Sequence, residues 1–322
     1  MASETSAPGT PAAVAVPDTI DRMLAGGRRP LHSFEFFPPK TLEGEANLWQ
    51  ALTELDVLRP DFVSVTYGAN GSRRDMTVTI TARIAQLMRE RRRRDPQAHV
   101  MQVMGHLTCA DQPVDELAEV IDRYAEVGIR HLLAIRGDMP GGPTVPWQRH
   151  PHGLPNATEL VRLIRRRRPD AIIGVAAFPD LHPQQRDAQL DARVLVEKQE
   201  AGASFAITQL FFEPGRYFEL VERVRALGSD LPIIPGIQPV TNVAQIRRFA
   251  DLSGAELPAS VVARLRAVAD DAEAVRRVGV DIGVELCRAL LAGGAPGLHY
   301  FTLNRSRATR EIFVRLKAEA AG

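Results

Sequence analysis

The 322-residue chain contains only two cysteines, Cys109 and Cys287, which lie far apart in the sequence. Two distant cysteines provide neither a disulfide framework nor the ligand spacing of a zinc site. Such sparse cysteine usage fits a reducing compartment, so we expect the protein in the cytoplasm. Each cysteine is expected to be a small apolar core residue rather than a nucleophile.

The sequence also lacks an excess of charge of either sign. It has 40 basic and 39 acidic residues, which gives a formal net charge of +1. This balance offers no electrostatic basis for nucleic acid or an acidic membrane surface as the main partner. The basic runs Arg89–Arg94 and Arg165–Arg168 end predicted helices, where cations oppose the negative end of the helix dipole.

Long hydrophobic runs are absent as well. No stretch approaches the length of a membrane-spanning helix. Residues 1–17 are rich in Ala, Pro, Ser, Thr and Val, and they lack the basic start and continuous apolar stretch of a signal peptide. We therefore predict a disordered tail over residues 1–17 and one soluble catalytic domain over residues 18–322.

What the sequence does contain is a series of short apolar runs, separated by longer segments with helical periodicity. Continuous rather than alternating apolarity indicates strands buried on both faces, as in a parallel sheet. Eight such runs predict an α/β fold, a single (β/α)8 TIM barrel, with extra helices near the C-terminus because residues 258–291 exceed one helix. The alternative is a doubly wound sheet, but Pro38 and Pro39 stand where its glycine-rich fingerprint would be expected. The predicted strands are His32–Phe37, Phe62–Tyr67, Val100–Cys109, His131–Asp138, Ala171–Phe178, Phe205–Phe212, Ile233–Ile237 and Leu298–Asn304.

Glu35 is the sharpest candidate among the polar residues near the ends of these strands, where barrel active sites are built. It is flanked by Phe34 and Phe36, and loss of hydration there would raise its pKa. A carboxyl group that stays protonated near neutral pH suits a general acid. The alternative is a buried glutamate paired with an arginine, whose pKa would fall instead.

The other candidates keep open alternatives at this stage. Asp138 follows Arg136 and Gly137, and it could face a ligand or accept hydrogen bonds within a local turn. His106 could be a base, a metal ligand or a hydrogen-bond partner of a cofactor, and metal is the weakest option because no second ligand lies at metal spacing. Gln209 could bind a heterocycle or be a core amide bonded to a neighbouring strand. His182 could equally lie on the surface, and Phe249 is expected in the core.

Seven segments form one pattern along the chain: residues 33–40 (SFEFFPPK), 62–69 (FVSVTYGA), 106–109 (HLTC), 136–138 (RGD), 207–209 (ITQ), 234–237 (IPGI) and 300–305 (YFTLNR). Together, in this order and spacing, they closely resemble the methylenetetrahydrofolate reductase family. The resemblance runs from about residue 30 to the end and covers the catalytic barrel alone, as in the short bacterial form. It leaves no room for the C-terminal S-adenosylmethionine-binding domain of eukaryotic members.

The resemblance implies an FAD-dependent oxidoreductase that reduces 5,10-methylenetetrahydrofolate to 5-methyltetrahydrofolate with NADH or NADPH. Donor and folate would use one flavin face in turn, which implies ping-pong kinetics. The reaction belongs to one-carbon metabolism and the supply of methionine. The resemblance also leaves room for a homo-oligomer, although no sequence feature marks an interface, and it does not choose between the two donors.

Residue roles carry over only by this resemblance. Glu35 would protonate the folate and open its five-membered ring, Asp138 would favour the resulting cation, and Gln209 would bind the pterin and position the nicotinamide. Substrate contacts are implied for Gln209, Gln245, Phe249 and Arg305. FAD contacts are implied for Thr66, Tyr67, Ala69, His106, Arg136, Gly137, Asp138, Ala157, Phe178, His182, Asp191 and Lys198.

The chain departs from the family pattern at Gly105, Asn156, Phe178 and Val194, which implies weaker retention of FAD. Two other functions are weighed against this one. A proline dehydrogenase-like flavin barrel would need a clamp of arginines, and only Arg305 is a clear candidate. A non-catalytic folate- or flavin-binding subunit is disfavoured because Glu35, Asp138 and Gln209 are all present.

Overall fold

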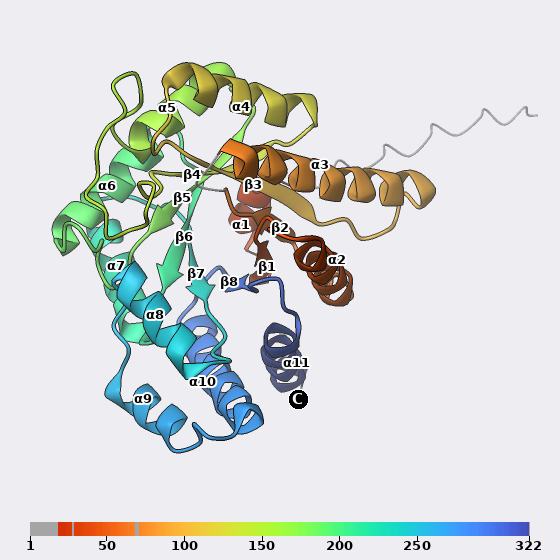
Figure 1. Ribbon diagram of the computed structural model, residues 1–322, viewed down its shortest axis with the longest axis vertical. Coiled ribbons are helices and arrows are strands. Elements are labelled where there is room, and N and C mark those ends of the chain that lie inside the picture. The colour runs from red at the N-terminus through yellow and green to blue at the C-terminus, as the bar shows by residue number, and fades with distance from the viewer. Residues whose placement is uncertain (1–18, 28, 68–70, 322) are drawn as a thin grey trace, which may run out of the picture.

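Eight parallel strands close into a barrel in the computed structural model, which describes residues 19–27, 29–67 and 71–321 (Figure 1). Each strand pairs with its neighbours in sequence, and the last strand pairs with the first. The predicted single (β/α)8 barrel is therefore confirmed. The strands are β1 (Leu31–Phe36), β2 (Phe62–Val65), β3 (Gln102–Thr108), β4 (His131–Ile135), β5 (Ile172–Ala177), β6 (Phe205–Leu210), β7 (Ile233–Ile237) and β8 (Gly297–Phe301).

Helices alternate with the strands and surround the barrel (Figure 1). The region 258–291 contains two helices, α9 and α10, as its length predicted. No helix in the described ranges is both long and apolar enough to cross a membrane. The helices are α1 (Ile20–Gly26), α2 (Leu42–Asp56), α3 (Gly71–Arg94), α4 (Val114–Glu126), α5 (Ala157–Arg167), α6 (Ala188–Glu200), α7 (Pro214–Ala226), α8 (Val243–Ser253), α9 (Ala259–Arg266), α10 (Ala272–Ala292) and α11 (Arg307–Ala321).

The short helix α1 was not predicted from the sequence. Its first residue, Ile20, is fully buried and joins a cluster with the barrel residues Phe62, Met104 and Phe205. The backbone N–H of Ile20 points to Nε2 of His131, at the start of β4, over 3.4 Å. Helix α1 thus covers the N-terminal end of the barrel.

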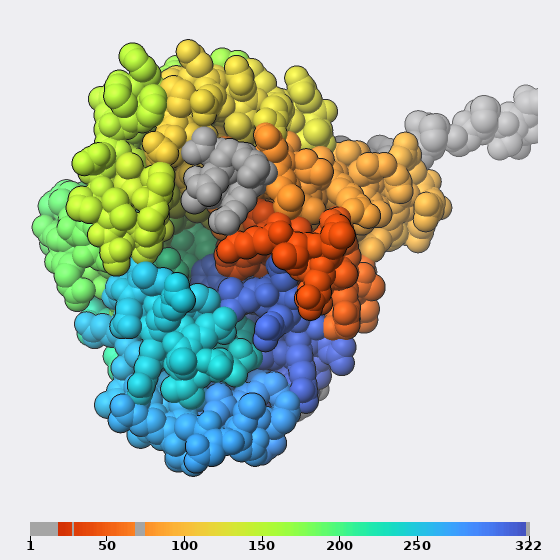
Figure 2. Space-filling model, viewed as in Figure 1, coloured from red at the N-terminus to blue at the C-terminus, as the bar shows by residue number. Residues whose placement is uncertain are grey.

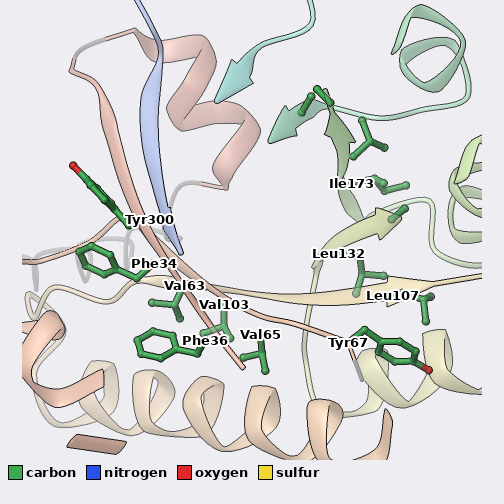
Figure 3. Close-up of a cluster of buried hydrophobic side chains, with 14 of the residues drawn as sticks. Phe34, Phe36, Val63, Val65, Tyr67, Val103, Leu107, Leu132, Ile173 and Tyr300 are labelled. Carbon is green, nitrogen blue, oxygen red and sulfur yellow. The ribbon is translucent and has the colours of Figure 1, made fainter. Parts of the chain in front are cut away.

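The alternation of side chains along β1 separates the two cores of the barrel. Phe34 and Phe36 belong to the large cluster between strands and helices, and Figure 3 shows them beside Val63 and Tyr300. Glu35, between them in the sequence, must point to the opposite face of the strand. It therefore enters the barrel interior near its C-terminal end.

Several strands end earlier in the structure than the sequence predicted. The fourth was predicted to reach Asp138 but ends at Ile135, because the chain turns at Gly137, whose φ is +80°. The sixth was predicted to reach Phe212 but ends at Leu210, after an irregularity in its pairing with β7. The predicted tail, residues 1–17, lies outside the described residues.

Candidate active site

Polar side chains converge at the C-terminal end of the barrel, as expected for this fold. They come from β1, β3 and β8 and from the segments that follow β2, β4 and β5. Figure 2 shows the molecule with the surface hollowed near its centre, between the yellow-green segment after β4 and the cyan segment around α8.

Glu35 forms the centre of the first cluster and is 7% exposed. Its Oε1 accepts a hydrogen bond from the Thr66 hydroxyl over 3.0 Å. Its Oε2 lies 3.3 Å from Nε2 of His299 and 3.7 Å from Nε2 of His106. The carboxyl group therefore sits between two imidazoles and a hydroxyl, in a position where it can exchange protons with nitrogen bases.

These neighbours correct the expected electrostatics of Glu35. Burial raises the pKa of the Glu35 carboxyl, but His106, His299 and Thr66 together lower it by more, so the net direction is downward. The prediction of a raised pKa was wrong because it rested on burial alone, whereas His106, His299 and Thr66 favour the carboxylate. The alternative of a paired glutamate is nearer the observed site, although its partners are histidines.

His299 is the member of this cluster that the sequence reasoning missed. It is fully buried in β8, with one ring nitrogen facing Glu35 and Nδ1 2.7 Å from the Ser33 hydroxyl. A hydrogen-bonded line therefore runs from Ser33 through His299 to Glu35. The available signal was a histidine between Leu298 and Tyr300, which is as unusual in an apolar strand as a glutamate.

His106 has two ring nitrogens that are buried and make no hydrogen bond within the described part of the chain. Burial, and to a lesser extent the charge of His299, lowers its pKa to about 4 against the opposing effect of Glu35. The imidazole is therefore neutral at pH 7. Buried polar nitrogens normally have partners, so a bound ligand is a natural one here. Of the options for His106, a metal centre gains no support, since the described residues contain no cluster of metal-ligating side chains.

A second cluster begins after β4 with Arg136, Gly137 and Asp138. Arg136 donates to the Gln184 side chain over 2.9 Å and stacks on Trp147 at 4.8 Å. A Cβ on Gly137 would lie 2.6 Å from Cβ of Thr108, so only glycine fits this turn. Asp138 is exposed beside them. Partial desolvation nevertheless raises its pKa, against the opposing charge of Arg136.

The same cluster continues into the segment after β5 and into α6. The Asp191 carboxylate accepts the backbone N–H of His182 over 2.8 Å, and the His182 ring contacts Phe178 edge-on at 4.8 Å. Lys198 is buried and donates to the carbonyl of Ala176 over 3.0 Å. Burial lowers the pKa of Lys198 to about 8, with Asp191 opposing the shift.

The remaining predicted residues are more dispersed. Gln209, on β6, is half-buried, and its Oε1 accepts the backbone N–H of Leu210 over 2.9 Å. Gln245 and Arg305 are exposed. Phe249 packs partly against the cluster around α8, as its expected core role requires. Tyr67 and Ala157 are buried, and Ala69 lies outside the described residues.

The second cluster has the chemistry of a site for an anionic cofactor. Arg136 and Lys198 supply positive charge, and the glycine turn lets the backbone approach a bound group closely. The unpartnered nitrogens of His106 lie between this cluster and Glu35 in strand order. The residues present therefore fit a large, phosphate-bearing cofactor with a polar heterocycle.

Comparison with known proteins gives consistent similarities. The family model described as methylenetetrahydrofolate reductase matches residues 19–317. The chain is 38% identical over 296 residues to 5,10-methylenetetrahydrofolate reductase of Escherichia coli K12, covering 92% of this chain and 94% of that protein. It is 33% identical to methylenetetrahydrofolate reductase (NADH) 1 of Zea mays, covering 92% of this chain and 50% of that protein.

A solved structure shares the fold at low sequence identity. It is an uncharacterized protein from Clostridium thermocellum described as binding two copies of 5-methyl-5,6,7,8-tetrahydrofolic acid. It is 12% identical, with a TM-score of 0.59 over 94% of this chain and 99% of that one.

Proposed function

This chain belongs to the methylenetetrahydrofolate reductase family, and we propose that it reduces 5,10-methylenetetrahydrofolate to 5-methyltetrahydrofolate with FAD and with NADH or NADPH. The reaction serves one-carbon metabolism and the supply of methionine. Family membership supports the folate substrate, and the arrangement of the chain's own side chains supports the proton chemistry.

The observation that carries the proposal is the placement of Glu35 among proton-exchanging groups at the catalytic end of the barrel. Reduction of the methylene bridge breaks one of its C–N bonds, and the nitrogen released from that bond needs a proton. Glu35 is the buried carboxyl group that can provide it. The protein groups around Glu35 favour its carboxylate form. A bound pterin would remove the remaining water and shift the balance toward the protonated acid.

The proton reaches Glu35 from the adjacent imidazole. His299 faces Oε2 over 3.3 Å, and its Nδ1 is held by the Ser33 hydroxyl over 2.7 Å. The Ser33 contact fixes the ring orientation, so that Nε2 faces the carboxyl. Thr66, on the other oxygen, keeps the carboxyl group in one rotamer. After transfer to the folate nitrogen, Glu35 is again a carboxylate.

The cofactor site would be formed by the second cluster. Arg136 and Lys198 would neutralise the phosphates, the turn at Gly137 would let the backbone approach the ring system, and His106 would donate or accept a hydrogen bond. When bound, FAD supplies the two-electron chemistry between the nicotinamide donor and the folate. Asp138, at the exposed edge, would stabilise positive charge on the ring-opened folate.

Gln209 offers an amide group to whichever substrate occupies the site. Its Oε1 accepts the backbone N–H of Leu210, so the NH₂ group is the donor that it would offer to a ligand. Phe249, Gln245 and Arg305 would contact the folate or the donor from the rim. Because both substrates use the same place in turn, the proposal predicts ping-pong kinetics.

The test separates the two half-reactions by anaerobic stopped-flow absorbance. We expect purified, FAD-loaded protein to be bleached by NADH or NADPH and its colour to be restored by methylenetetrahydrofolate. In Glu35→Gln the amide keeps the size of the side chain but cannot donate a carboxyl proton. We expect its folate half-reaction to slow on the order of 10²-fold or more, with flavin reduction changed by less than about threefold.

The matched control is Glu43→Gln, the same chemical change at an exposed site in the first turn of α2, for which we expect both rates to be unchanged. If Glu35→Gln impaired both half-reactions equally, Glu35 would be structural. If the folate failed to reoxidise the bleached wild-type protein, the assigned substrate would be wrong.

A further inference from the structure

A cavity lies at the opposite end of the barrel from Glu35. Its volume is about 310 Å³, within the range of small-molecule sites. The start of β1, the α2–β2 and α3–β3 connections and helix α11 supply its wall. The lining includes Arg29, His32, Arg59, His99, Phe313 and Lys317. No residue of the Glu35 cluster or of the Arg136 cluster lines it.

The charges around this cavity are unbalanced. Arg29 is paired with Asp61 through contacts of 2.5 and 3.1 Å, and the Asp61 side chain is only 3% exposed behind it. Arg59 and Lys317 form no ion pair within the described part of the chain. Three cations therefore face one carboxylate, and the two unpaired cations leave a local charge that would attract an anion.

His32 supplies the second, independent sign of a ligand. Its side chain is 5% exposed and lines the cavity, yet its Nδ1 has no hydrogen-bond partner among the described residues. Its backbone N–H is already satisfied by Asp61 over 2.8 Å, and its ring meets Phe313 edge-on at 4.7 Å. Because Nδ1 is closed to solvent, the ring nitrogen that a ligand in the cavity can reach is Nε2, which also makes no hydrogen bond within the described residues and would take a polar partner.

The imidazole is suited to donate rather than to carry charge. Burial, with the nearby charges of Lys317 and Arg29, lowers the pKa of His32 to about 3. The ring is therefore neutral at pH 7 and has one N–H to give. A dianion in the cavity would oppose the effect of Lys317 and Arg29 and shift the pKa of His32 upward.

We propose that this cavity is a binding site for a phosphate group, held by Arg59 and Lys317 and by the imidazole of His32. A phosphate carries nearly two charges at neutral pH, which matches two unpaired cations, and it has several oxygens for their donors. The group could be free inorganic phosphate or part of a small phosphate ester that also contacts Phe313. This site is independent of the proposed reductase chemistry.

The experiment uses the full chain loaded with FAD, at fixed ionic strength. Inorganic phosphate and glycerol phosphate are titrated separately by calorimetry, with chloride as the ionic-strength control. The imidazole NMR resonances of His32, assigned by comparison with His32→Phe, are followed in the same titrations. We expect saturable binding of at least one phosphate probe, accompanied by a shift of the His32 resonances.

The variant is Arg59→Gln with Lys317→Gln, two exposed positions whose change should not disturb folding. Its matched control is Arg193→Gln with Arg266→Gln, which removes the same charge from exposed positions outside the cavity. We expect the first pair to weaken phosphate binding about tenfold or more and the control pair to change it less than about twofold.

The arms of the titration identify the source of the phosphate. Tighter binding of glycerol phosphate supports an ester ligand, and equal or tighter binding of inorganic phosphate supports the free ion. The proposal is overturned if neither probe binds saturably, if the two pairs of variants weaken binding equally, or if binding leaves the His32 resonances unmoved.

Discussion

Replacement of His131 tests how helix α1 is held on the barrel. His131 is 3% exposed, and its Nε2 faces the first N–H of α1. Burial, and more weakly Arg130, lowers its pKa from 6.5 to about 4, with Asp21 opposing the shift. The folded protein therefore keeps this imidazole neutral in a pH range where the unfolded chain protonates it.

The sign and size of the effect follow from this difference in pKa. The stabilising contribution is complete above pH 6.5 and is lost as the pH falls from 6.5 to about 4, because the unfolded state binds the proton first. At 1.36 kcal/mol per pKa unit the full loss is about 3 kcal/mol, of which about 2 kcal/mol is lost between pH 7 and pH 5. Other buried histidines add to the total loss of stability on acidification, but their contribution is the same in a His131 variant.

We expect His131→Gln to cost about 1 kcal/mol at pH 7, since the amide oxygen can still accept the N–H of Ile20. Its further loss between pH 7 and pH 5 should be about 2 kcal/mol smaller than that of the wild type. Urea unfolding at the two pH values measures both quantities, with the exposed His152→Gln as control. If His131→Gln lost as much stability on acidification as the wild type, His131 would not be the buried neutral group described.

Three further substitutions probe the site and its support. For Gly105→Ala we expect a loss of about 1–3 kcal/mol in urea unfolding, because a Cβ there would lie 2.4 Å from the Tyr124 ring; a loss below about 0.5 kcal/mol would contradict this packing. For Gly137→Ala we expect a similar loss and weaker FAD retention in flavin-release assays, since its φ is +80° and a Cβ would meet Thr108; unchanged retention would remove the turn from the cofactor site. For His299→Gln we expect the folate half-reaction to slow on the order of tenfold with an altered pH profile, and flavin reduction to stay within about twofold; an unchanged folate rate would exclude it from the proton path.

The barrel could be predicted from the sequence because buried parallel strands produce a local signal. Each run of apolar residues is visible without knowledge of its partners, and alternation with helices leaves few topologies. Helix α1 gave no such signal. Its seven residues are too few for a clear period, and the burial of Ile20 depends on the end of a barrel that the rest of the chain forms.

The candidate site was predicted less completely, for a physical reason that β1 illustrates. That Glu35 is unusual can be seen locally, but its neighbours come from β3, β8 and the segment after β2. Sequence neighbours such as Phe34 indicate burial but not these partners, so they predicted the wrong pKa direction. The partner His299 lies 264 positions away, and only closure of the barrel brings the two together.

Two departures from the family pattern, Gly105 and Asn156, take part in local packing and helix capping. At Gly105 the missing side chain makes room for Tyr124, whose hydroxyl donates to the carbonyl of His106 over 2.9 Å and so supports the neighbouring ring. Asn156 caps α5 by accepting the N–H of Glu159 over 3.0 Å. Both residues have structural uses that help to hold the site in place.

Phe178 is different, because its ring contacts His182 directly, within the second cluster. A tyrosine at that position would add a hydroxyl group to a side chain that already contacts His182 of the proposed cofactor site. Nothing in the structure explains Val194. We therefore expect Phe178→Tyr, among single changes toward the family pattern, to slow FAD release most, and Asn156→Tyr to destabilise α5 by about 1 kcal/mol through loss of the cap. A flavin-release assay compares the rates at which the two variants lose FAD. If Asn156→Tyr slowed FAD release more than Phe178→Tyr did, the loop before α5, and not the Phe178–His182 contact, would set the affinity.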